Sequence, residues 1–87
     1  MNSIAISQGV LVNLENKKVT LDKKVISSTY LVLEIWNKVF EVLPKKEDIN
    51  SILKNNSELM NDLNFNNLIQ EFKKHLLNQD FDLILKD

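Results

Sequence analysis

Residues 28–43, Ser-Thr-Tyr-Leu-Val-Leu-Glu-Ile-Trp-Asn-Lys-Val-Phe-Glu-Val-Leu, decide the predicted fold. The polar residues of this segment recur every three or four positions, the spacing of one narrow polar stripe on an α-helix. Because most of the remaining circumference is apolar, we expect this helix to be covered on several sides. We expect Ser28 to cap its N-terminus, with Ser27 and Thr29 as alternatives, and Pro44 to end it. The polar stripe consists of Glu34, Asn37, Lys38 and Glu41.

The N-terminal part of the chain has the alternation of apolar and polar residues that is typical of short strands. Residues 4–6 indicate an edge strand, and Gly9, the one glycine, indicates a turn with positive φ. Residues 10–14 and 19–21 alternate again on either side of a polar turn, which predicts a β-hairpin. Residues 25–26 are either a further strand or the beginning of the helix.

After Pro44 the sequence predicts two more helices and an apolar C-terminal segment. Ile49, Ile52 and Leu53 have the spacing of a short helix. Residues 65–77 form the clearest amphipathic pattern, and residues 81–85 indicate either a strand or an apolar tail. The apolar face of the amphipathic helix comprises Phe65, Leu68, Ile69, Phe72, Leu76 and Leu77, and Asn66, Gln70, Lys73 and Lys74 point away from it.

These elements predict a single α+β domain spanning residues 1–87. We expect a small winged-helix-like domain in which two or three short antiparallel strands are followed by three helices packed on one face of the sheet. The composition is 44% apolar and lacks cysteine, so a globular chain without disulfides or thiolate metal sites is expected. A signal peptide and a membrane span are not apparent, which favours a cytoplasmic protein. Frequent Asn and Lys indicate an AT-rich genome.

The titratable residues give little support for catalysis. His75 is the only histidine, and Glu71, one helical turn before it, suits an ordinary surface pair. We therefore expect no enzymatic activity, no metal and no cofactor. All eleven basic residues are lysines, and the absence of the arginine fork argues against nucleic-acid binding. The lysines at 17, 18, 23 and 24 either steer an acidic peptide toward the hairpin or protect a strand edge.

Three groups of apolar residues carry a resemblance to a known family. Together they resemble the domain of the coenzyme PQQ synthesis protein D and its relatives, which recognise the precursors of ribosomally made, modified peptides. The resemblance covers roughly residues 10–85. The segment after Leu21-Asp22 lacks the glycine common in the family, which leaves the position of the third strand open. The groups are Ile35-Trp36 with Val39 and Phe40; Ile49, Ile52 and Leu53; and Ile69, Phe72, Leu76, Leu77 and Phe81.

The resemblance implies a non-catalytic accessory protein that captures the leader of a precursor peptide and presents it to a modifying enzyme. The leader would add a strand to the sheet in a groove between its edge strand and the last helix. The partners would be the leader and the enzyme, with the chain a monomer or homodimer. The alternatives are a phage- or plasmid-encoded inhibitor or immunity factor and, less favoured, a winged-helix DNA binder. The implied peptide-binding residues are Val19, Thr20, Leu21, Asp22 and Lys24 on the sheet side (with 24–27 as an alternative edge), and Asn67, Gln70, Glu71 and Lys74 on the helix.

Overall fold

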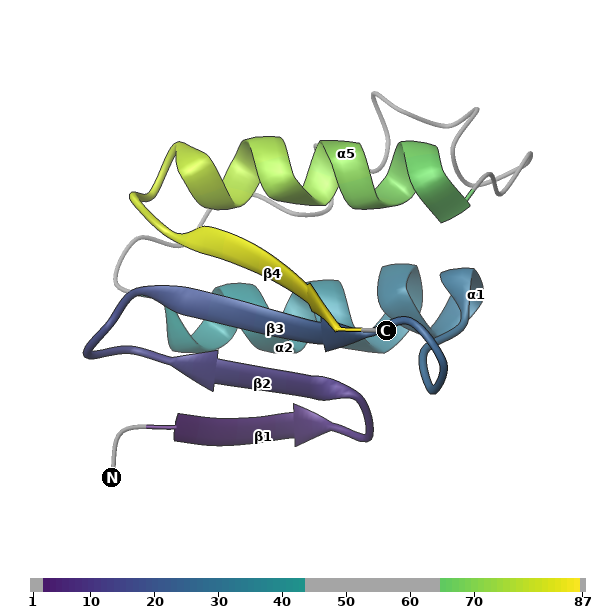
Figure 1. Ribbon diagram of the computed structural model, residues 1–87, viewed down its shortest axis with the longest axis horizontal. Helices are drawn as coiled ribbons and strands as arrows, with labels where there is room; N and C mark the ends of the chain where they lie inside the picture. The colour runs from purple at the N-terminus through teal and green to yellow at the C-terminus, as the bar shows by residue number, and fades with distance from the viewer. Residues whose placement is uncertain (1–2, 44–64, 87) are drawn as a thin grey trace.

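The computed structural model describes residues 3–43 and 65–86, which form a four-stranded sheet with helices on one face (Figure 1). The predicted α+β class is confirmed. The predicted short helix around Ile49, Ile52 and Leu53 lies outside the described residues. The strands lie side by side in the order β1 (Ser3–Ser7), β2 (Val10–Asn13), β3 (Lys18–Asp22) and β4 (Asp82–Lys86). The helical segments are α1 (Ser28–Tyr30), η1 (Leu31–Ile35) and α2 (Trp36–Val42), which are continuous, and α5 (Phe65–Leu77).

The first three strands form the predicted antiparallel meander. Gly9 has φ 91° in the turn between β1 and β2, as its conformational freedom predicts. The hairpin of β2 and β3 closes through a turn in which the Asn16 N–H donates to Asn13 Oδ1 over 2.9 Å and Lys17 has φ 54°. Val25 and Ile26 form no further strand and instead lead into the helix.

The fourth strand corrects the prediction of a purely antiparallel sheet. Residues 82–86 are a strand rather than an apolar tail, and they pair with β3 in parallel. At the two ends of this ladder, the Asp82 N–H donates to the Lys17 carbonyl over 3.0 Å and the Lys23 N–H to the Lys86 carbonyl over 3.1 Å. Consequently β3 is bonded on both sides, and β1 and β4 are the outer strands.

The helix that begins with α1 is capped by Ser27, one of the alternatives that the sequence suggested. Ser27 Oγ accepts the Tyr30 N–H over 3.2 Å, the bond that a serine N-cap makes to the third helical residue. The helix ends at Val42, and Leu43 is extended, with φ −77° and ψ 149°. A residue before proline is disfavoured in the α region, so Pro44 explains this stop.

A π-helical turn sits inside this helix and aligns its buried residues. In an ideal α-helix, residues four apart drift around the axis by about 40° at each step. The Trp36 N–H bonds to the Leu31 carbonyl five residues earlier, and this wider turn reduces the drift. Two rows with a spacing of four therefore stay on the core side. The rows are Leu31, Ile35, Val39 and Leu43, and Val32, Trp36 and Phe40, all buried.

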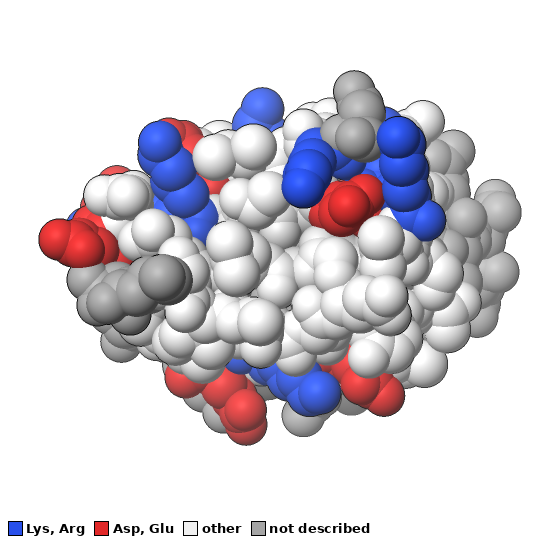
Figure 2. Space-filling view, turned by 60° about the horizontal axis from the view of Figure 1, so that its bottom comes forward, with Lys and Arg blue, Asp and Glu red and all other residues white. Residues whose placement is uncertain are grey.

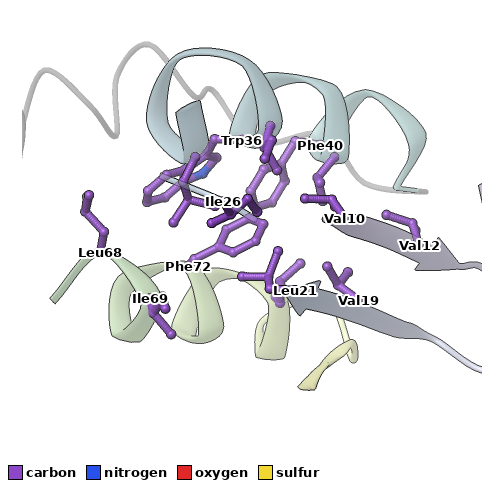
Figure 3. Close-up of a cluster of buried hydrophobic side chains, with 14 of the residues drawn as sticks. Val10, Val12, Val19, Leu21, Ile26, Trp36, Phe40, Leu68, Ile69 and Phe72 are labelled. Carbon is purple, nitrogen blue, oxygen red and sulfur yellow. The ribbon is translucent and has the colours of Figure 1, made fainter. Parts of the chain in front are cut away.

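The core lies where this helix, α5 and the sheet meet (Figure 3). The Phe72 ring of α5 lies 5.3 Å from the Trp36 ring and 6.2 Å from the Phe40 ring, measured between centroids. Two residues on the apolar circumference of the helix beginning at α1 are exposed: Leu33, to 57%, and Tyr30. Leu77 was predicted to face the core, but it is exposed as well.

A tight turn after α5 directs the chain back to β3. Asp80 adopts φ 62°, its N–H bonds to the Leu77 carbonyl over 3.0 Å, and the Phe81 N–H bonds to the Leu76 carbonyl over 2.9 Å. This pair of bonds is the Schellman motif, in which the residue with positive φ is commonly glycine. Phe81 is buried immediately after it, so the turn fixes the point at which β4 begins.

Candidate functional site

The position beside β3 that β4 occupies is the centre of the candidate site. Figure 1 shows β4 lying between β3 and α5, and β4 contacts both elements. We call this position the fourth-strand site. It is where the resemblance to the precursor-recognition domains implies an added peptide strand, but the chain fills it with its own residues 82–86.

The predicted sheet-side residues lie together along β3 and the turn after it. Val19 and Leu21 point into the core and are fully buried, whereas Thr20 and Asp22 alternate onto the opposite face and are half-buried. Lys24 is exposed, and its backbone N–H donates to Asp22 Oδ1 over 3.0 Å. The prediction that β3 is the edge strand is wrong, because β4 bonds to that edge. A peptide can pair with β3 there only after β4 has left.

The predicted helix-side residues divide between two directions. The Glu71 Oε2 atom lies 3.9 Å from His75 Nε2, and the His75 ring packs near Trp36 of α2. Glu71 is therefore on the flank of α5 turned toward α2, and Asn67, one turn earlier, shares that flank. The structure does not bring these two residues to the fourth-strand site. Gln70 and Lys74 are exposed and line a shallow hollow of about 310 Å³ with Lys73, Leu77 and Asn78.

His75 is less exposed than the surface pair that the sequence suggested. Its side chain is 17% exposed, and its ring centroid lies 6.0 Å from that of Trp36 and 6.5 Å from that of Phe40. The predicted pairing with Glu71 is present at 3.9 Å. The imidazole therefore covers the aromatic core at the side of α5, which is a packing role.

The charged residues of β3 and β4 lie in opposite order. β3 reads Lys-Val-Thr-Leu-Asp and β4 reads Asp-Leu-Ile-Leu-Lys. In the parallel register Lys18 is opposite Asp82, and Asp22 is opposite Lys86. An antiparallel register about the same centre would place lysine beside lysine and aspartate beside aspartate. Opposite charges across a ladder stabilise a sheet and like charges destabilise it, so the charge order favours the parallel arrangement.

The sheet face turned away from the helices carries a row of uncharged, mostly apolar residues that crosses all four strands. Ala5, Leu11, Thr20 and Ile84 are successive cross-strand partners, and Leu11 and Ile84 are both exposed. A shallow depression of about 280 Å³ lies on this face, with Asp22 among its lining residues. Figure 2, turned so that the β1 side comes forward, shows a broad uncharged surface with charged side chains at its margins.

Asp82, Ile84 and Lys86 were not predicted as members of the site, and Lys18 was predicted only as one of four lysines that could steer an acidic peptide or protect a strand edge. The signal that could have identified them is the inverted charge order of residues 18–22 and 82–86. This charge order indicates a parallel pairing only when the two segments, about sixty residues apart in the chain, are compared as neighbouring strands.

Comparisons of the chain with protein-family models, with curated proteins and with solved structures find no match. Within residues 3–43 and 65–86, no three His, Cys, Asp or Glu side chains are grouped so that they could hold a metal ion. None of the helices in the described part of the chain has the length and apolar character needed to cross a membrane.

Proposed function

We propose that this chain is a non-catalytic, cytoplasmic peptide-binding protein that takes up the leader of a ribosomal precursor peptide as a strand and presents it to a modifying enzyme. The proposal extends the resemblance to the winged-helix-like precursor-recognition domains. One observation carries it: the chain holds an extended segment, β4, beside β3 and against α5, where such a leader would bind.

In this proposal the leader exchanges with β4. No side chain of β4 is fully buried: Leu83 is half-buried, and Ile84 and Leu85 are 41% and 43% exposed. Apolar contacts therefore hold β4 less firmly than they hold β2 and β3, whose inward-facing residues are buried. The main attachment of β4 is the backbone ladder with β3, and an incoming peptide can form the same bonds. A leader that also reaches the exposed α5 residues Gln70, Lys73 and Lys74 would contact this helix in addition to forming the ladder with β3.

An engineered disulfide tests this exchange. Thr20 and Ile84 are cross-strand partners on the open face, and the chain has no native cysteine to interfere. Partners in adjacent strands lie within the range of Cα separations that a disulfide spans. We expect the oxidised Thr20→Cys/Ile84→Cys protein to lose measurable binding of the fluorescein-labelled precursor peptides encoded beside its gene. Reduction should restore binding, as read by fluorescence anisotropy.

A matched control shares one of the two positions. Leu11 is the partner of Thr20 on the other side, so Leu11→Cys/Thr20→Cys links β2 to β3 and leaves β4 free. This variant should bind the peptides equally well when oxidised and when reduced. Full binding by the oxidised Thr20→Cys/Ile84→Cys protein would place the peptide elsewhere, and no binding by the unmodified protein would remove the proposed function.

A second candidate function is that of a small protein-interaction module, such as an inhibitor or immunity factor. The observation that favours it is β1, an outer strand of sequence Ser-Ile-Ala-Ile-Ser without charge or proline. Outer strands are usually protected by such residues, and an unprotected one offers its backbone to a partner. Binding that persists in the disulfide-locked protein but is lost on Ala5→Pro would favour this candidate.

A further inference from the structure

We infer that the fourth-strand site selects an extended peptide with an acidic residue at one end, a basic residue four positions later and apolar residues between them, and that β4 is a built-in occupant with this pattern. The inference rests on the proposed function and names the class of peptide that the site would accept. It follows from the residues that β3 presents to whatever strand lies beside it.

The two faces of β3 favour different residues in a neighbouring strand: apolar residues on the helix side and charged residues at the two ends of the open face. On the helix side, Val19 and Leu21 are opposite Leu83 and Leu85. Leu83 packs against the core, so an apolar residue is required at its position. On the open face, Lys18 and Asp22 flank Thr20 and are opposite Asp82 and Lys86. A peptide with the same charges places an opposite charge beside Lys18 and beside Asp22, whereas a lysine facing Lys18 introduces repulsion.

The backbone directions show how β4 can be released without altering β3. In a strand, every second residue directs its backbone N–H and C=O groups toward the same neighbouring strand. The Asp82 N–H and the Lys86 carbonyl are both bonded to β3. Ile84 lies midway between these two residues, so its N–H also points toward β3. Proline at position 84 removes that donor. Ile84→Pro should therefore weaken the hold of β4, which as a tethered competitor acts at an effective concentration on the order of millimolar.

The test measures two peptides against two acceptors. The peptides are labelled and capped, with the sequence of residues 81–86, Phe-Asp-Leu-Ile-Leu-Lys, and a version with lysine in place of its aspartate. The acceptors are the full chain carrying Ile84→Pro and the same chain with Lys18→Asp added. Asp22 is left unchanged because it also accepts the Lys24 N–H.

We expect the acceptor with Lys18 to prefer the aspartate peptide by about three- to tenfold, and the acceptor with Lys18→Asp to prefer the lysine peptide by a similar factor. Both preferences should shrink at 1 M salt, where charges are screened within about 3 Å. The same preference for both acceptors would overturn the inference.

A second measurement separates this inference from the proposed function. If no peptide binds to either acceptor, the result counts against the proposed exchange of β4 with a leader. The charge preference is then tested within the chain itself, between Lys18 and Asp82. Lys18→Asp should lower the denaturation midpoint, and Asp82→Lys in the same protein should restore part of the loss. If the second change lowers the midpoint further, Lys18 does not select the charge opposite it, and the inference fails.

Discussion

Replacement of Trp36 by alanine is expected to lower the free energy of unfolding by about 3–5 kcal/mol, the usual cost of emptying a large aromatic site in a core. Trp36 is 0% exposed and contacts the rings of Phe72 and His75. Small domains bury a smaller fraction of their surface, so this loss would remove much of a total stability that is typically about 5–15 kcal/mol. Urea denaturation followed by circular dichroism measures it without depending on the tryptophan signal.

Two control substitutions distinguish loss of packing from a general effect on the helix. Leu33→Ala alters the same helix at a residue that is 57% exposed, and it should cost less than about 1 kcal/mol. Trp36→Phe keeps a ring and removes an indole N–H that has no hydrogen-bond partner among the described residues, so it should cost less than alanine. A midpoint for Trp36→Ala close to that of the unchanged protein would contradict the burial of this side chain.

Replacement of Gly9 by alanine is expected to cost about 1–3 kcal/mol, the range for a residue forced into an unfavourable backbone conformation. Gly9 has φ 91°, and an added Cβ would lie 3.1 Å from Val25 Cβ. The Gly9 carbonyl also accepts the Asp22 N–H over 2.8 Å, so the turn cannot move away freely. Thermal and urea denaturation should both show the loss.

A double substitution separates the two causes at Gly9. Val25→Gly removes the Cβ that a side chain at position 9 would meet, so in the Gly9→Ala background it relieves the contact but leaves the strain in φ. Val25 is 43% exposed, so Val25→Gly alone should cost little beyond the added backbone freedom of glycine. We expect partial recovery of stability. Gln8→Ala, an exposed change in the same turn, serves as the control. A Gly9→Ala protein as stable as the Gln8→Ala protein would show that the turn accepts a side chain.

Local patterns in the chain were sufficient to predict most of its individual elements. The alternation in residues 4–6, 10–14 and 19–21 predicted β1, β2 and β3, and the periodicity of residues 28–43 and 65–77 predicted the two long helices. Gly9 marked its turn because only glycine adopts φ near 91° at little cost. These predictions succeeded because strand and helix periodicities depend on neighbours only a few residues away.

The tertiary structure decided which element covers which surface. Leu33 and Leu77 belong to apolar patterns and yet are exposed, because periodicity identifies an apolar face without saying whether another element packs on it. The parallel pairing of β4 with β3 joins segments far apart in the chain, and it turns the predicted edge strand into an internal one. The opposite charge order of Lys18–Asp22 and Asp82–Lys86 favours this pairing, but it acts only once α5 and its C-terminal turn bring the two strands together.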